Sequence, residues 1–348
     1  MAVGDNARFG YDSFVGISEE TTYGTSADSF SYIEFSSESM KRNIEEIKLE
    51  SINTSRDYIK RLRGNESIEG SLEFDLNVAA DACVYLLKQA MGGTVATAVL
   101  YTTTSSGRGH TLNTGNMENN KSSSGSTDTV ALTLEIQKGG NESTGTVWDF
   151  LGTRVNSISI KGEIGAPVVM TAELIGQTAS TTSSTPTVTF TDINPCNFTG
   201  ITINTGDSIT NVSAETFIGF ELTLNNNLIS DTNARKLGSR TLQILPPARR
   251  EVNLKLTQRF DTTTSYDRFI DNTMTAIQIL LDSEQTIAAN CSTYSMHINL
   301  PACYFNSNMP EIGDFGVVTH EVEVSAIKEN TTTSYSIQMQ INNATANY

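Results

Sequence analysis

Apolar and polar residues alternate with a period of two along much of the chain. From residue 68 to 76 the apolar positions are Ile68, Leu72, Phe74 and Leu76, and polar positions between them are Glu69, Ser71, Glu73 and Asp75. Such alternation places one set of side chains on each face of a strand. It predicts a strand with one buried and one polar face, followed by a helix over residues 78–91.

The same pattern returns 184 positions later. Val252, Leu254, Leu256 and Phe260 are the apolar positions of a second predicted strand, and a second helix begins at Thr264. Its apolar stripe is formed by Tyr266, Phe269, Ile270 and Met274. Predicted strands at 154–161 and 168–175 match a later pair at 318–327 and 335–342. Because identity between the copies is low, the repeat depends on pattern and order.

The repeat predicts an α+β fold, mainly β, with one short helix in each half. We expect a first module at residues 1–177 and a second at 189–348. A linker at 178–188, rich in Ser and Thr, separates them. Further strands are predicted at 31–40, 130–137, 217–224 and 294–300.

Three polar segments interrupt the strands. Residues 102–129 are Ser, Thr, Asn and Gly with few apolar residues, which predicts a surface loop. Residues 41–65 and 229–249 are long connections that carry basic residues, and we interpret them as arms. The candidate contact residues of the first arm are Lys48, Arg56, Lys60, Arg61 and Arg63. A solvated loop balanced by Glu45, Glu46 and Glu50 is the alternative.

Composition restricts the partners of this chain. Its 348 residues carry a formal charge of −16, and the pI is about 4.6, which argues against binding nucleic acid through its phosphates. No apolar run reaches the length of about 18 residues that a membrane helix needs. The first residues lack the charged and apolar regions of a secretory signal. We therefore expect cytoplasmic synthesis and no membrane partner.

No residue pattern predicts catalysis, a cofactor or a metal. His110, His297 and His320 lie in different segments, and the four cysteines, Cys83, Cys196, Cys291 and Cys303, are read as buried apolar residues. The acidic residues of interest lie on predicted strand faces and are Glu69, Glu73, Asp75, Glu321 and Glu323. They form either an ordinary hydrated sheet face or a surface lined with negative charge.

Several segments resemble the tail tube proteins, or major tail proteins, of long-tailed bacteriophages. In the first half they are FVGISEETTYGT (14–25), SFSYIEFSSESM (29–40), LLKQAMGG (86–93) and FLGTRVNSISIKGEIGAPVVMTAELIG (150–176). In the second half they include ELTLNNNL (221–228), the region of Pro301 and the last strand pair. Order and spacing carry the resemblance, which covers most of the chain.

The resemblance implies two tandem β-sandwich tail-tube modules that contribute to a closed β-barrel ring. Stacked rings would form a hollow virion tail, made in the host bacterial cytoplasm, that conducts DNA into the host without binding it specifically. The acidic strand faces would then line the lumen, and the arms would meet the adjacent ring. Two modules per chain imply a homotrimer with pseudo-sixfold symmetry, with a homohexamer as the alternative. Further implied partners are the tail tape measure, tail terminator and tail tip proteins.

Two other classes of protein compete with this interpretation. A β-sandwich carbohydrate-binding or adhesin module would need an exposed aromatic platform, for which the single Trp148 beside Phe150 is poor material. An enzyme acting on polysaccharide would need a carboxylate pair in a cleft.

Overall fold

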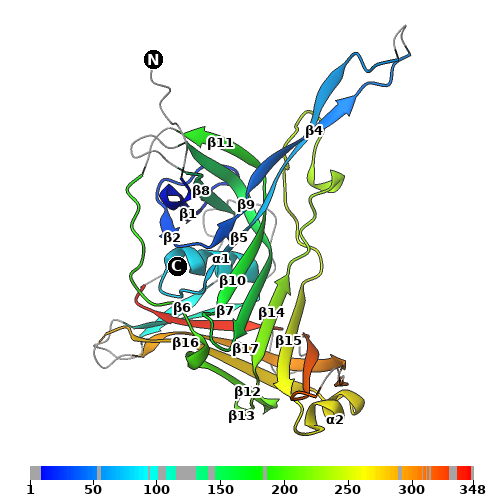
Figure 1. Cartoon of the computed structure of the whole chain (residues 1–348). Coiled ribbons are helices and arrows are strands. Elements are labelled where there is room, and N and C mark those ends of the chain that lie inside the picture. The colour runs from blue at the N-terminus through cyan, green and yellow to red at the C-terminus, as the bar shows by residue number, and fades with distance from the viewer. Residues whose placement is uncertain are drawn as a thin grey trace.

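The computed structural model describes most of the chain. The described residues are 9–52, 56–92, 95–100, 107–114, 131–139, 146–182, 186–288, 292–307, 309–310, 312, 315–328 and 335–345. Within them, 19 strands join in one antiparallel network beside two α-helices (Figure 1). No helix of the described part is long and apolar enough to cross a membrane.

The elements of the first half are β1 (Phe14–Glu19), β2 (Ser31–Ile33), β3 (Ser37–Glu38), β4 (Lys41–Lys48), β5 (Arg61–Asp75), α1 (Asp81–Met91), β6 (Val95–Leu100), β7 (Arg108–Asn113), β8 (Leu132–Gln137), β9 (Val147–Glu163), β10 (Val169–Gly176) and β11 (Thr178–Thr182). Those of the second half are β12 (Ile201–Ser208), β13 (Asn211–Ala214), β14 (Gly219–Asn225), β15 (Glu251–Arg259), α2 (Thr264–Ile270), β16 (Thr275–Thr286), β17 (Thr293–Ser307), β18 (Thr319–Ala326) and β19 (Gln338–Asn343).

One large sheet crosses the whole molecule and contains strands of both halves. Its order is β4–β5–β10–β9–β14–β15–β18, with β3 beside β5 and the end of β17 beside β18. The two halves meet where β9 pairs with β14. Seven successive residue pairs form this junction, so the halves share one continuous sheet.

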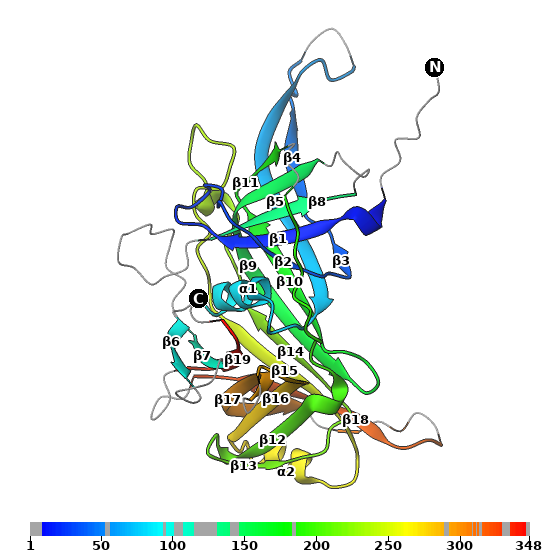
Figure 2. The same ribbon diagram turned by 90° about the vertical axis from the view of Figure 1, so that its left-hand side faces the viewer.

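Two long strands leave the large sheet and enter smaller sheets. The first part of β9 pairs with β8 and β11, in a sheet that also holds β1 and β2. The first part of β17 pairs with β16 and β19, which continue to β12 and β7 (Figure 2). The turn in β9 lies at Gly152, whose φ of +63° favours glycine. A Cβ at this position would lie only 2.7 Å from Cβ of Gln177.

The apolar faces of all these sheets enclose one main hydrophobic core. Ile68 and Leu72 of β5, Leu222 of β14 and Leu254 of β15 are at most 1% exposed and belong to the same cluster. The alternation predicted for residues 68–76 and 252–256 is therefore confirmed by the burial of one side chain in two along β5 and β15, whereas the predicted apolar position Phe260 lies beyond β15 and is 38% exposed. Cys83, Cys196 and Cys303 are buried, as predicted, whereas Cys291 lies outside the described residues.

The two helices occupy different environments. Helix α1 is mostly buried and ends at Gly92, whose φ of +65° gives a left-handed cap. It begins at Asp81, later than predicted, because the side chain of Asn77 accepts a hydrogen bond from the amide of Ala79 before the helix starts. Helix α2 begins at Thr264 as predicted, but it buries only Ser265. The apolar stripe of residues 266–274 suggests a core contact, but Ile270 in it is 58% exposed.

The strand pairings of the first half recur in the second. The first series is β2–β1–β8–β9–β10–β5–β4, and the second is β13–β12–β16–β17–β18–β15–β14. Both series have an irregularity at the same place: the register skips Asn156 between β9 and β10, and it skips Asn306 between β17 and β18. The topology thus repeats in far more detail than the sequence does.

This repeat corrects part of the sequence interpretation. The counterparts of β9 and β10 are β17 and β18, so matching residues 154–161 to 318–327 and 168–175 to 335–342 was wrong. Alternation alone cannot distinguish one half-buried strand from the next. The strand predicted at 31–40 is broken into β2 and β3.

Three segments predicted as connections contain strands. Residues 41–65 include β4 and the start of β5, and the predicted loop at 102–129 includes β7. The rest of that loop falls largely outside the described residues. The predicted linker at 178–188 begins with β11, which pairs with β9. In each case long-range pairing supplies order that the local composition does not indicate.

A cross-strand pair of carboxyl groups makes stability depend on pH. Glu135 of β8 lies opposite Asp149 of β9, and its side chain is buried. Burial, and then the charge of Asp149, raise the pKa of Glu135 to about 7. Because this value lies above the ordinary value of 4.5, the stabilising contribution is complete below pH 4.5 and is lost as the pH rises through about 7.

We therefore expect Glu135→Gln to reduce the loss of stability between pH 5 and pH 8 by about 1–3 kcal/mol, since each pKa unit corresponds to about 1.4 kcal/mol. Urea unfolding of the variant and the wild type at both pH values measures this difference. Glu284→Gln, at an exposed position, serves as the control. An unchanged pH dependence in Glu135→Gln would contradict the assignment.

Candidate functional site

The face of the large sheet that points away from the core is rich in charge. Because facing residues of neighbouring strands project to the same side, the register of the sheet identifies which side chains share this face. Its carboxylates are Glu69, Glu73, Asp75, Glu163, Glu173, Glu221, Glu251, Glu321 and Glu323, and its cations are Lys41, Lys161, Lys255 and Arg259. We call this surface the charged face.

In one row of the charged face, basic and acidic side chains alternate across β9, β14, β15 and β18. This row runs through Asp75, Val169, Lys161, Glu221, Lys255 and Glu323. Nζ of Lys255 lies 2.7 Å from Oε2 of Glu321, and Nζ of Lys161 lies 2.8 Å from Oε1 of Glu163. The hydrogen bond to Glu321, followed by the charges of the surrounding carboxylates, raises the pKa of Lys255. The cations are thus balanced locally, and an acidic excess remains.

The structure brings together all five acidic residues selected from the sequence. Glu69, Glu73 and Asp75 lie on β5, while Glu321 and Glu323 lie across the sheet on β18. The sequence interpretation missed Glu163, Glu173 and Glu251 as members of the same face. Strict alternation along residues 168–175 would have found Glu173, but the other two lie at the ends of strands.

A long β-hairpin projects from one edge of the large sheet. Strand β4 pairs with β5 from Lys41 opposite Glu69 to Lys48 opposite Arg61 (Figure 1). The predicted arm at 41–65 is thus a two-stranded ribbon over most of its described length, and we call it the hairpin arm. Its predicted contact residues, Lys48, Arg56, Lys60, Arg61 and Arg63, are all exposed.

The hairpin arm also carries exposed apolar side chains. Ile47 and Leu62 face each other across the two strands and are 42% and 54% exposed. Ile52, Tyr58 and Ile59, nearer the tip, are exposed as well. Since a hairpin without a covering layer is only marginally stable in water, these residues mark a surface that suits a partner.

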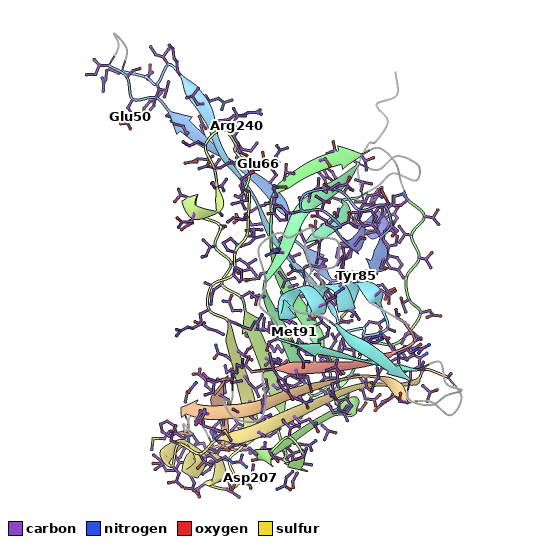
Figure 3. All side chains as sticks on the ribbon, turned by 180° about the vertical axis from the view of Figure 1, so that it is seen from behind. Glu50, Glu66, Tyr85, Met91, Asp207 and Arg240 are labelled. Carbon is purple, nitrogen blue, oxygen red and sulfur yellow. The ribbon has the colours of Figure 1, made fainter. Side chains whose placement is uncertain are left out.

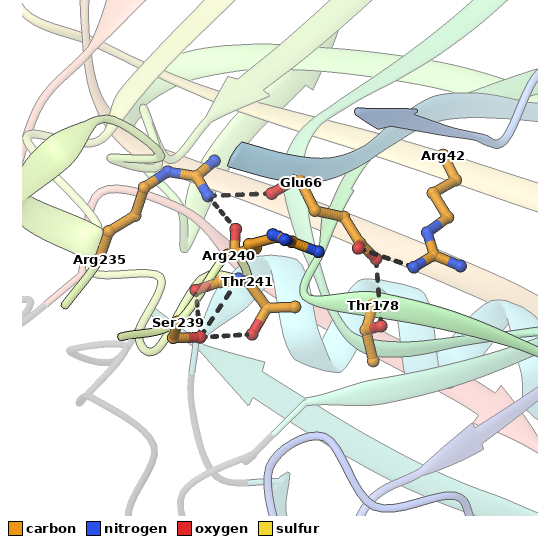
Figure 4. Close-up of polar contacts among 7 residues, drawn as sticks. All are labelled: Arg42, Glu66, Thr178, Arg235, Ser239, Arg240 and Thr241. Carbon is orange, nitrogen blue, oxygen red and sulfur yellow. Dashed lines mark hydrogen bonds and ion pairs between the residues drawn. The ribbon is translucent and has the colours of Figure 1, made fainter. Parts of the chain in front are cut away.

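Glu66 fixes the base of the hairpin arm. Its carboxylate accepts hydrogen bonds from Nη2 of Arg42 at 2.7 Å and from Oγ1 of Thr178 at 3.2 Å (Figure 4). Its backbone joins the second arm: the Glu66 amide donates to the carbonyl of Arg240, and Arg235 donates to the carbonyl of Glu66. The carboxylate is almost fully buried, so these contacts are shielded from water.

The second arm, residues 229–249, is a loop folded on the surface of the first half. Ala234, Leu242 and Leu245 form a small apolar cluster against Ile175 of β10. The fully buried Arg154 of β9 donates from Nη1 to the carbonyl of Leu245 at 3.0 Å. We call this segment the loop arm; it corresponds in the repeat to the hairpin arm but is packed rather than projecting.

The opposite end of the molecule is partly apolar and hollowed. A pocket of about 260 Å³ lies where β9 ends and where β12 and β14 begin. Ile164 and Phe198 on its rim are 65% and 42% exposed, and Phe217 and Phe220 also line it. Figure 3 shows Glu50 of the hairpin arm and Asp207 of β12 at opposite ends of the molecule.

The described residues give little support to the competing classes of protein. Trp148 packs against the core, partly buried, and does not form an exposed platform. Glu221 and Glu323 line a hollow of about 340 Å³ on the charged face, but Lys255 lies between them in the row, and the acidic residues of β5 do not line it. No group of three or more His, Cys, Asp or Glu side chains in the described part could hold a metal ion.

Removal of the Glu66 carboxylate tests how the hairpin arm is held. We expect Glu66→Ala to accelerate tryptic cleavage in the arm several-fold and to lower the free energy of unfolding by about 1–3 kcal/mol, because buried hydrogen bonds are lost. Limited proteolysis with mass spectrometry locates the cuts. The control is Glu46→Ala, which removes only an exposed ion pair with Arg61 at 3.8 Å. Equal cleavage of both variants would exclude the proposed anchor.

Comparison with known proteins identifies the family of this chain. No curated protein matches the chain closely enough to be reported as a relative. Residues 10–326 match the family described as phage tail tube protein, which covers most of the chain, including both copies of the repeat and the charged face. The chain therefore belongs to the phage tail tube protein family, a family of structural proteins of the bacteriophage tail.

Proposed function

We propose that this chain is a structural subunit of a tail tube whose stacked rings conduct DNA during ejection into the host. The observation that carries the proposal is the β9–β14 junction, which continues one sheet across both halves with one core face and one charged face. A sheet that continues through neighbouring copies in the same way closes on itself and leaves no free edge. In this role the protein needs neither a catalytic residue nor a cofactor.

We further propose that the chain consists of two tube modules, at residues 1–177 and 189–348, joined by residues 178–188. The recurrence of the pairing series supports this division. Each β-sandwich module would supply one sixth of a closed β-barrel, so three chains would complete the ring with pseudo-sixfold symmetry. A homohexamer is the alternative, and the mass of the ring distinguishes six chains from three.

The charged face would line the lumen of this ring. Its acidic excess, on a chain of charge −16, repels phosphate, while the local ion pairs keep the repulsion moderate. DNA would therefore slide without specific binding. The tail tape measure protein would occupy the same lumen before ejection, and the tail terminator and tail tip proteins would cap the tube. Such a subunit is made in the host bacterial cytoplasm and functions in the virion tail.

The hairpin arm would join one ring to the next. It extends beyond the sheet at one end of the molecule, and its exposed apolar residues match the apolar pocket at the other end in chemical character. In a stack of rings these two ends face each other. Burial of Ile52, Tyr58 and Ile59 against Ile164 and Phe198 of the next ring would stabilise the stack, while the basic residues would meet acidic surface.

A shortened hairpin arm tests both ring size and stacking. We expect that replacing residues 47–62 by a two-residue turn leaves rings that no longer stack, because only the base of the arm belongs to the sheet. Negative-stain microscopy should show tubes for the wild type and single rings for the variant. Native mass spectrometry should give three chains per ring. Six chains would contradict the two-module ring, and tubes of normal length from the variant would contradict the role of the arm.

Charge reversal on β5 tests the lumen. We expect the triple variant Glu69→Lys, Glu73→Lys and Asp75→Lys to assemble, since exposed charges contribute only about 0–1 kcal/mol each. Genome ejection from virions built with it should be slower, and added salt should reduce the delay by screening the attraction to phosphate.

The control for the lumen test reverses three exposed acids that lie off the charged face, Asp28, Asp192 and Glu284. It should eject DNA at the rate of the wild type. If the β5 variant assembled only at high salt, and its tubes then ejected DNA normally, these residues would belong to a subunit interface instead of the lumen.

A further inference from the structure

The junction between the two halves contains a complete example of a seam between repeats. Along it Thr223 of β14 lies opposite Ser159 of β9, and Asn225 lies opposite Ser157. Backbone pairing holds this seam, and the apolar side chains Leu222 and Ile160, also facing each other, seal it from the core side. The two strands belong to different copies of the repeated pairing series, so the seam joins the end of one copy to the start of the next.

The counterpart of β14 in the first copy is residues 37–43, which include β3 and the start of β4. Gly219 pairs with Thr257 of β15, and Ser37 pairs with Glu73 at the same position of β5. The match continues to the other end. Asn225 pairs with Glu251, as Asn43 pairs with Ser67.

The counterpart of the seam region of β9 lies at the end of β17. The skipped residues Asn156 and Asn306 align the two strands, so Ser307 takes the position of Ser157 and Met309 that of Ser159. Met309 and Ile312 are 75% and 82% exposed, and within the described part no strand pairs with the chain after Ser307. Likewise, β3 and β4 pair only with β5 among the described strands. The repeat therefore begins and ends with open edges.

We propose that these two edges pair with each other between copies of this chain, in the register of the internal junction. Asn43 of one copy lies opposite Ser307 of a second copy, and Lys41 lies opposite Met309. The occupant of the edge is a second copy because both strands of the internal seam have counterparts at the open edges. Strand β14 corresponds to β3 and the start of β4, and the seam region of β9 corresponds to the end of β17. This inference deepens the proposed function and rests on it, since it specifies the contact that closes the ring.

Two charged side chains cover the edge in the isolated chain. The amide of Ser39 donates to Ser71 of β5, so the backbone groups of the next residue, Met40, point outward. The Met40 amide donates to Oε2 of Glu38, and its carbonyl accepts from Nζ of Lys138. Nζ of Lys138 lies 3.0 Å from Oε2 of Glu38, so these two side chains also form an ion pair. Before assembly, Glu38 and Lys138 thus hydrogen-bond the outward-facing backbone groups of Met40, which limits unspecific strand pairing. In the ring, the strand of a second copy takes their place.

Disulfide trapping tests the register. The variant Lys41→Cys, Met309→Cys carries both changes at exposed positions, so the fold of the subunit is preserved. Oxidation of assembled rings should link chains covalently, and denaturing gels without reductant should show dimers and trimers. The internal reference is Ser159→Cys, Thr223→Cys, which should form a bridge within one chain at the corresponding position. Each single variant measures background from the native cysteines.

A register control uses Ser37→Cys with Met309→Cys, on the same edge but four residues away from Lys41. We expect the matched pair to give at least about ten times the intermolecular product of this control, because Cα atoms more than about 7 Å apart cannot be bridged without backbone movement.

The outcomes separate the seam from the proposed function. If rings and tubes form but the matched pair links no better than the register control, the seam is wrong while the tube function stands. If the chain remains monomeric under all conditions that assemble tail tubes, the proposed function and the seam fail together. Covalent trimers from the matched pair support both, and a ladder reaching six chains supports the seam but not the trimer.

Discussion

The backbone pairing of β9 with β14 is the contact on which the architecture depends. It aligns the alternation of both halves, so that Ile160, Leu222 and Leu254 point to one core, and Lys161, Glu221 and Lys255 point to the other side. A shift of β14 by one residue against β9 would place Glu221 on the core side and expose Leu222. The charged face, the common core and the position of both arms therefore follow from one seam.

The sequence predicted the strands whose two faces have different environments. Residues 68–76 and 252–260 alternate because one face is buried and the other is hydrated, and both segments are strands. Strands whose two faces have similar surroundings show no such alternation. Strand β4 is exposed on both sides, and β11 consists of Ser, Thr and Ala, so neither carries a periodic signal. Strand β4 is ordered by pairing with β5 in the hairpin arm, and β11 is ordered by pairing with β9. The fold class and the acidic members of β5 and β18 were accessible from sequence, whereas the relation between them required the register.

The structural roles of individual residues were harder to predict. Glu66 was not selected, because a glutamate in a basic polar segment is indistinguishable from a solvated one. Only the folded chain shows that it is buried and that it joins β4, β11 and the loop arm. Arg154 is a similar case: it follows Gly152 in a strand that turns between two sheets, and its guanidinium reaches the loop arm. Buried polar contacts between distant segments leave no local pattern, and these contacts position the arms.

The projection of one arm and the packing of the other would determine how successive rings are oriented on each other. A ring with identical arms on all modules could meet its neighbour in six equivalent rotations. In the proposed trimer, projecting hairpins alternate with packed loops, so only three rotations bring each hairpin to an equivalent receiving surface. The rotation of each ring relative to the next would then be set by the alternation of the two modules within one chain. A ring rotated by one module would place a hairpin against the wrong surface, so such an error would not be carried along the tail.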